Sequence, residues 1–188
     1  MPTSLAVVVD ACVLVPAALC DFLLRAAATG LYRLCWTNDI LDEVQRTLIN
    51  DLGKQPEQVA RRIAAMTRAF PDALVTSHTR LIGSIPVEIN AKDRHVVAAA
   101  VASGAPLIVT SNLRDFPAAA LESLGVEAQS PDEFLMDLFA LDADAVQTIV
   151  VRQSAALRTP PMTPVEVVEA LGRQAPTFAA NLRHVMRL

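Results

Sequence analysis

The sequence has few aromatic side chains, few cysteines and no excess of basic charge. Aromatic residues make up 4% of its 188 residues, so a platform on which successive bases stack is not expected. The net charge of −4 argues against a basic protein that coats DNA, although a metal ion can offset the charge of an acidic site in a nucleic-acid enzyme. Cys12, Cys20 and Cys35 cannot all pair, and no two have the spacing of zinc ligands. We interpret them as buried free thiols in a reducing cytoplasm.

Long apolar runs and nucleotide-binding loops are also missing. The longest uncharged stretch, residues 96–113, contains Gly104, Pro106 and several hydroxyl groups, which is typical of a helix, a turn and a strand and not of a membrane span. The first residues have no basic flank, and Asp10 interrupts their apolar part, so no signal peptide is expected. Neither GxxxxGK[ST] nor GxGxxG occurs. We therefore expect a cytoplasmic protein with no membrane partner.

A hydrophobic fraction of 53% is enough to build a sizeable core. The length favours one domain with an appendage, and the pattern places the boundary between residues 1–141 and residues 142–188. Short β-branched runs and amphipathic segments alternate in the first part, which indicates an α/β fold with a parallel sheet. The expected strands are 5–9, 34–36, 107–110 and 126–128, with 87–89 as a further candidate. The expected helices are 13–28, 38–52, 55–69, 90–103, 117–124 and 131–141.

Beyond residue 141 the pattern is helical only. Segments 142–157, 164–171 and 177–188 are separated by prolines and predict a C-terminal helical appendage. Val165, Val168 and Leu171 give it an apolar face that must be buried on the main domain or on a partner.

Four carboxylates fall at matching places along this pattern. Asp10 closes the first strand, and Asp115 lies just beyond the strand at 107–110. Glu43 lies in the first turns of the helix after the second strand, and Asp93 lies at the start of the helix before residues 107–110. In a parallel sheet all four places lie at the carboxyl ends of the strands, where such sheets bind ligands. Four acids gathered there repel one another unless a cation lies among them.

Four segments together resemble a known family. VVVDACVL, ILDEVQRTL, AKDRHVVAAAV and LIVTSNLRDFP resemble, in order and spacing, a PIN domain over residues 4–137, and in particular the VapC toxins of bacterial toxin–antitoxin pairs. The resemblance implies a Rossmann-like α/β/α sandwich with a central, mostly parallel sheet. It also implies a metal-dependent endoribonuclease whose acids fall on Asp10, Glu43, Asp93 and Asp115. Products with a 5′-phosphate and a 3′-hydroxyl, a small antitoxin partner and a homodimer follow from the same resemblance.

One residue departs from the pattern of many PIN proteins. They have an acid two residues after the threonine of the last segment, where this chain has Asn112, and its acid comes three residues later at Asp115. The form TxNxxDF also occurs in the family. The departure leaves open whether Asp115 binds metal directly or through water.

The residue types suggest different roles at a metal site. Mg²⁺ and Mn²⁺ prefer oxygen ligands, and such an ion can neutralise a phosphodiester and activate water. Our hypothesis makes Asp10 and Asp93 the main metal ligands. Glu43 and Asp115 would hold a second ion or orient the attacking water. The short polar side chains that can support the ligands are Thr110, Ser111 and Asn112. The candidate contacts to the RNA backbone are Arg94, Arg114 and Arg46.

Each acid also has a plainer interpretation. Asp10 can simply end its strand, and Asp93 forms a capping-box pattern with Asn90. Asp115 is placed to cap the helix after Pro117, and Glu43 fits a solvated helix face. His95 is interpreted as a packed or surface residue. At the level of function, the alternative to a nuclease is a weak or inactive PIN-fold binding module whose acidic pocket holds a basic partner segment. An aspartyl phosphatase is disfavoured, because no acid stands two residues after Asp10.

Overall fold

The computed structural model describes residues 4–158 and 160–188. Within them the chain forms a four-stranded parallel sheet in the order β2-β1-β3-β4. The strands are β1 (Ala6–Val9), β2 (Arg33–Cys35), β3 (Leu107–Val109) and β4 (Glu127–Gln129). Each lies within one or two residues of its expected place. The predicted α/β class with a central parallel sheet is confirmed.

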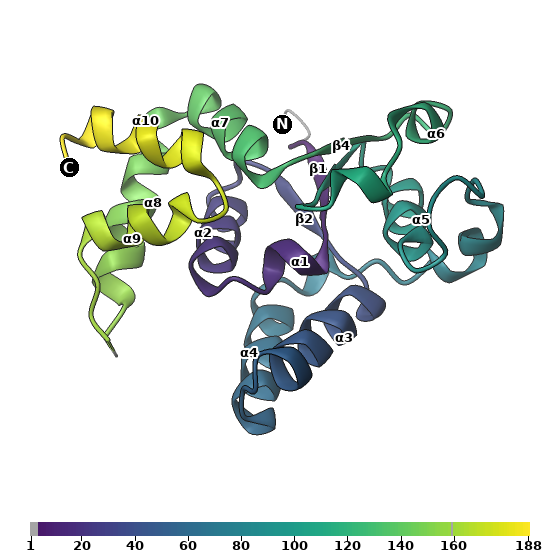
Figure 1. The fold of residues 1–188 in the computed structure, drawn as a ribbon, viewed down its shortest axis with the longest axis horizontal. Helices are drawn as coiled ribbons and strands as arrows, with labels where there is room; N and C mark the ends of the chain where they lie inside the picture. Colours follow the sequence, from purple (N-terminus) through teal and green to yellow (C-terminus); the bar gives the residue numbers. More distant parts are fainter. Residues whose placement is uncertain (1–3, 159) are drawn as a thin grey trace.

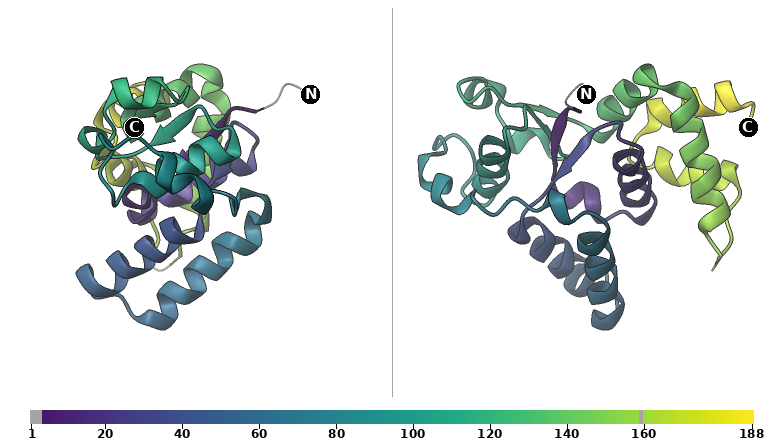
Figure 2. Two further views of the ribbon diagram at one scale, coloured as in Figure 1. Left: turned by 90° about the vertical axis from the view of Figure 1, so that its right-hand side faces the viewer. Right: turned by 180° about the vertical axis from the view of Figure 1, so that it is seen from behind.

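The two central strands are apolar because both of their faces are covered. All four residues of β1 and all three of β3 are buried, as expected for parallel strands between two layers of helices. Figures 1 and 2 show α5 (Arg94–Ser103) on one side of the sheet and α2 (Ala17–Ala28) on the other. The edge strand β4 is different, since Glu127 is exposed and Ala128 and Gln129 are half-buried.

The helices of the first half follow their sequence signals. Thr37 caps α3 (Asn38–Arg46) by accepting a hydrogen bond from the Ile40 backbone N–H at 3.2 Å. A π-helical turn, Thr47–Asp51, continues it, and α4 (Pro56–Ala69) follows. The single helix expected over 13–28 is instead two helices, α1 (Ala11–Leu14) and α2. Pro16 lies between them and has no N–H to continue a helix.

The segment 70–90 holds two 3-10 turns, Pro71–Ala73 and Thr79–Ser84, and no strand. The candidate strand at 87–89 was therefore wrong. The Arg94 guanidinium donates hydrogen bonds to the carbonyls of Ile89, at 3.1 Å, and Val87, at 3.4 Å. Val87 and Ile89 would share one face of a strand, yet Val87 is 79% exposed and Ile89 is buried, and an arginine and not a neighbouring strand bonds to the backbone.

The second half ends with α6 (Ala118–Glu122), α7 (Pro131–Leu141), α8 (Ala143–Ala156), α9 (Pro164–Gly172) and α10 (Pro176–Met186). Ser130 and Glu133 form a capping box at the start of α7, as the sequence predicted for Ser130. Figure 1 shows α7–α10 gathered beside α2, away from α5 and α6.

The C-terminal helices are joined to the sheet domain by core contacts. The rings of Phe22 in α2 and Phe178 in α10 pack edge to face, with their centroids 5.4 Å apart, and both side chains are fully buried. The Asp132 carboxylate of α7 accepts hydrogen bonds from the backbone N–H groups of Thr177, at 3.1 Å, and Phe178, at 2.8 Å. These bonds satisfy free donors at the start of α10.

The predicted apolar face of the appendage is buried on the main domain, with one change. Val168 and Leu171 are fully buried, but Val165 is 38% exposed and Val167 takes its place in the core. The domain boundary at residues 141/142 stays a prediction. None of the helices in the described ranges is both long and apolar enough to cross a membrane.

We predict that Phe178→Ala lowers the free energy of unfolding by about 3–5 kcal/mol, because it leaves a cavity against Phe22. Urea unfolding followed by circular dichroism measures the loss. Val185→Ala on the same helix is the control, since Val185 is 41% exposed and should cost much less. Two separate transitions, of which only the smaller shifts in Phe178→Ala, would show that the C-terminal helices do not share the core.

Candidate functional site

The four predicted acids lie on elements that meet at the carboxyl end of the sheet. Asp10 follows β1 directly, and Asp115 lies in the 3-10 turn Leu113–Asp115 shortly after β3. Glu43 lies on α3, which follows β2, and Asp93 is the residue before the first turn of α5. The parallel order β2-β1-β3 sets the first three side by side, and α5 runs back along the sheet and brings Asp93 to them.

Asp10 is the most tightly held of the four. It is 6% exposed, and its Oδ1 accepts a hydrogen bond from the Ala11 backbone N–H at 2.7 Å. Its Oδ2 accepts hydrogen bonds from the Thr110 hydroxyl at 2.7 Å and from the Cys12 thiol at 3.1 Å. A buried carboxylate is costly unless it is hydrogen-bonded, and these three donors meet that requirement without a positively charged partner.

Asp93 carries an acceptor with no partner. Its side chain is 14% exposed and makes no capping hydrogen bond to α5, so the capping-box interpretation does not hold. Its Oδ2 is buried and has no hydrogen-bond donor among the described residues. Burial raises the pKa of this carboxyl above its ordinary value, and the charges of Asp115, Asp10 and Glu43 raise it further, against the lowering effect of Lys92. The negative charges of all three other acids therefore act on the Asp93 carboxylate.

Asp115 is held by its neighbours in the turn and by a lysine. Its Oδ2 accepts hydrogen bonds from the Asn112 amide and from the Lys92 ammonium, the latter at 3.1 Å. Pro117 begins α6 without any side-chain cap, so Asp115 does not cap that helix. Lys92 Nζ is also 3.7 Å from Asp93 Oδ2, which places one positive charge between two of the candidate ligands.

Glu43 lies at the more open side of the site. Its side chain is 43% exposed, and its Oε2 is 3.9 Å from His95 Nε2. Glu43, Asp93, Lys92 and His95 line a pocket of about 1010 Å³ together with Asp39, Asp42 and Arg46. Asp10 and Asp115 do not line this pocket, but Lys92, which lines it, reaches Asp115 at 3.1 Å.

The three small polar residues occupy the end of β3. Thr110 is fully buried, donates to Asp10 and accepts a hydrogen bond from the Asn112 backbone N–H at 3.1 Å. The Ser111 backbone N–H points at the Cys12 sulfur at 3.3 Å, so Ser111 acts here through its backbone. This chain of hydrogen bonds connects the end of β1 with the turn that holds Asp115.

The three candidate RNA-binding arginines are placed unequally. Arg46 lines the acidic pocket and donates from Nε to the Asp42 carbonyl at 3.4 Å. Arg114 donates from Nε to the Asn112 side-chain oxygen at 3.0 Å. Arg94 is engaged with the carbonyls of the 87–89 loop. Arg94 therefore stabilises the loop before α5, a role that the sequence did not predict.

Sequence reasoning missed Lys92, His95 and Cys12 as parts of the site. Lys92 and His95 flank Asp93 and Arg94 in the AKDRH segment, so adjacency to a predicted ligand was the available signal. Cys12 was assigned to the core, yet it touches Asp10 and lies 3.4 Å from Thr110 Oγ1. Burial raises the pKa of the Cys12 thiol to about 11, and the Asp10 charge adds to this, so the thiol is protonated and can donate to Asp10.

The donor set suits a hard divalent cation in part. Four carboxylates supply the oxygen ligands that Mg²⁺ and Mn²⁺ take, and the unpartnered Asp93 Oδ2 leaves one lone-pair site free. In the described ranges, however, no three acid, histidine or cysteine side chains are arranged to hold one ion together. Mg²⁺ keeps several waters and needs only one or two protein carboxylates, so the residues fit a hydrated ion.

Comparison with known proteins decides the family. Residues 6–114 match the family described as "PIN domain". The chain belongs to the PIN-domain family. Residues 131–184 match the family described as "VapC50 C-terminal domain", which covers α7 and the helices after it.

A curated relative has the same name, VapC50, as the C-terminal family. The chain is 44% identical over 94 residues to a protein of Mycobacterium tuberculosis (strain ATCC 25618 / H37Rv) described as "Putative ribonuclease VapC50". The match covers 50% of this chain and 56% of the relative, so the chain spans little more than half the length of that protein. No solved structure gives a significant match. The resemblance to VapC-like PIN proteins is thereby confirmed.

We predict that Lys92→Met strengthens the binding of Mn²⁺ about two- to fivefold, because it removes an exposed ammonium that competes for Asp115 and Asp93. Isothermal titration of the metal-free protein measures the dissociation constant. Lys54→Met, at an exposed lysine outside the pocket, is the matched control. Weaker Mn²⁺ binding in Lys92→Met would mean that the lysine supports the metal site and does not compete with it.

We also predict a pH-dependent gain in stability from Asp93→Asn in EDTA. A carboxyl whose folded pKa is raised stabilises the fold below its unfolded value of 3.8, and this stability is lost as the pH rises through the folded pKa. The asparagine cannot ionise, so the variant should unfold at a higher urea concentration than wild type at pH 7. The gain should vanish below pH about 3.8. An Asp93→Asn protein less stable than wild type at pH 7 would contradict this.

Proposed function

We propose that the protein is a metal-dependent endoribonuclease that hydrolyses RNA phosphodiester bonds. The observation that carries the proposal is the set of four mutually repelling carboxylates at the carboxyl end of a PIN-domain sheet, one of which has a buried oxygen without a donor. Charge of one sign gathered in one place destabilises the fold, so it points to a function that uses it. The relative described as a ribonuclease supports the same activity.

The proposed ligands are the four acids that the sequence pattern indicated. Asp10 and Asp93 would hold a Mg²⁺ or Mn²⁺ ion, and Glu43 and Asp115 would hold a second ion or orient the attacking water. When bound, the ion neutralises the phosphodiester and lowers the pKa of water. The hydroxyl of Thr110 and the thiol of Cys12 fix the Asp10 carboxylate in one orientation before any ion arrives.

Other residues of the chain bind and orient the substrate. Arg46 lies in the acidic pocket, and Arg114 lies beside Asp115 in the 3-10 turn Leu113–Asp115. Each is therefore placed to contact a phosphate that approaches the carboxylates. Lys92 is 61% exposed and is free to exchange Asp115 for an RNA phosphate once a cation has replaced it. Asn112 holds Asp115 through its amide, which offsets the absence of an acid at position 112.

The same family relation supports a biological setting. We infer that the protein acts as the toxin of a type II toxin–antitoxin pair in the cytoplasm, as a homodimer, with cellular RNA as substrate. A small antitoxin would inhibit it by placing a basic side chain among the carboxylates, as Lys92 already does within the chain.

A second candidate function rests on the position of that lysine. Because an ammonium already pairs with Asp115 and no three ligands are arranged for one ion in the described ranges, the pocket also fits a non-catalytic module that holds a basic segment of a partner. Such a protein would bind Mn²⁺ or a basic peptide without turning over any RNA. Cleavage measurements therefore separate the two functions.

We predict that purified protein cleaves RNA in Mn²⁺ or Mg²⁺, that EDTA stops cleavage, and that Asp10→Asn lowers the rate at least ~100-fold, since it removes a charged ligand and keeps the shape of the side chain. Mapping of the RNA ends should give 5′-phosphates. Asp21→Asn, at an exposed carboxylate on α2 that pairs with Arg25, is the control and should leave cleavage unchanged. The nuclease mechanism is refuted if Asp10→Asn cleaves as fast as wild type with an unchanged circular dichroism spectrum.

A further inference from the structure

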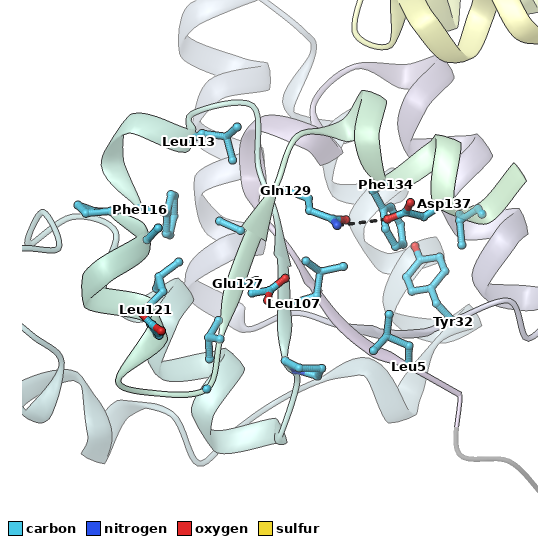
Figure 3. Close-up of a pocket in the computed structure, with 18 of the residues that line it drawn as sticks. Leu5, Tyr32, Leu107, Leu113, Phe116, Leu121, Glu127, Gln129, Phe134 and Asp137 are labelled. Carbon is cyan, nitrogen blue, oxygen red and sulfur yellow. Dashed lines mark hydrogen bonds between the residues drawn. The ribbon is translucent and has the colours of Figure 1, made fainter. Parts of the chain in front are cut away.

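A second hollow lies across the sheet, separate from the acidic pocket. Its volume is about 1210 Å³, and it extends over β3 and β4 between α6 and α7. Figure 3 shows Leu113 and Leu121 on one side of the strands, Phe134 and Asp137 on the other, and Glu127 between them. We call it the edge groove. It shares none of its lining residues with the acidic pocket.

The edge groove runs along a strand whose outer backbone is open. In the part of the chain that the structure describes, β4 is at the end of the sheet and pairs with β3 alone. The Glu127 N–H donates to the Pro106 carbonyl at 2.8 Å, and the Gln129 carbonyl accepts from the Thr110 N–H at 3.0 Å. In a parallel pair, alternate residues bond to the same neighbour, so the N–H and C=O of Ala128 point away from β3. An extended peptide can pair with them.

Apolar side chains are exposed around the same groove. Leu5, Leu113 and Leu141 line it and are 48%, 40% and 67% exposed, whereas most large apolar side chains of this chain are buried. Exposed leucines set around one hollow mark a binding surface more often than isolated ones do. Leu5 precedes β1, which β3 separates from β4, so a strand laid along the outer edge of β4 meets Leu113 and not Leu5.

The charge of the edge groove is negative. Its lining contains Glu122, Glu127 and Asp137 against one positive residue, Arg114. The Gln129 amide donates to Asp137 at 3.2 Å, which leaves the Gln129 side-chain oxygen buried without a donor. A second copy of the chain would bring the same carboxylates against one another. A basic segment would instead pair with them and supply the missing donor.

We propose that the edge groove is a docking site for an extended segment of a partner protein in which apolar and basic residues alternate. The segment adds a strand to β4 through Ala128, places an apolar side chain beside Leu113, and directs lysine or arginine towards Glu127 and Asp137. The edge groove is connected to the acidic site by one 3-10 turn, in which Leu113 and Arg114 line the groove and Asp115 follows them. Docking nevertheless needs no metal and no catalysis.

The test uses a fluorescein-labelled eight-residue peptide of alternating lysine and valine, with binding followed by fluorescence polarisation. A glutamate–valine peptide of the same length should not bind. The double variant Glu127→Lys, Asp137→Lys should weaken binding of the lysine peptide at least ~10-fold, through loss of complementary charge. The matched control is Glu57→Lys, Glu169→Lys, which changes the net charge equally at two exposed positions outside the groove.

Two further measurements make the outcome decisive. Hydrogen exchange of the Ala128 amide should slow when the peptide is added to the wild type, and Ala128→Pro, which removes a donor that β3 does not use, should weaken binding. Asp93→Asn should bind the peptide as the wild type does, so loss of nuclease activity and loss of docking are distinguishable. Equal binding to the double variant and its control overturns the proposal, as does a dimer in sedimentation equilibrium that Ala128→Pro dissociates, since a second copy would then fill the groove.

Discussion

The hydrogen bond from the Thr110 hydroxyl to the Asp10 carboxylate joins the ends of the two central strands, and the candidate site depends on it. Asp10 is buried, and within residues 4–158 and 160–188 its carboxylate is supported by neutral donors alone. Thr110 in turn accepts from the Asn112 backbone, and Asn112 holds Asp115. A single fully buried threonine thus fixes how two of the four acids lie relative to each other.

The four acids differ in the hydrogen-bond donors that support their carboxylates. Asp10 has hydroxyl, thiol and backbone donors, and Asp115 has an amide and an ammonium. Among the described residues, no hydrogen-bond donor reaches the buried Asp93 Oδ2, and burial together with the charge of the other three acids raises the pKa of this carboxyl. The repulsion among the acids is therefore concentrated at Asp93, and a cation bound there would reduce it.

Much of this was readable from the sequence because it rests on local signals and on one topological rule. The apolar runs at β1 and β3, the Ser130 capping box and the left-handed Gly104 at the end of α5 are set by neighbours within a few residues. The four acids followed from the rule that parallel strands end at one edge. Long-range pairing was not readable: Arg94 bonding to the 87–89 carbonyls replaced a strand, and Lys92 reaches an acid 23 residues away. Nor did the periodicity show that Val167, and not Val165, faces the core.

The contact between Phe22 and Phe178 has a consequence for how the chain matures. Helix α2 is made early in synthesis, but the aromatic ring that covers it comes from α10, more than a hundred and fifty residues later. Until α10 has left the ribosome, the α2 side of the sheet lacks part of its cover and the emerging polypeptide exposes apolar surface. The α2 side of the core is therefore completed only after α10 has been translated.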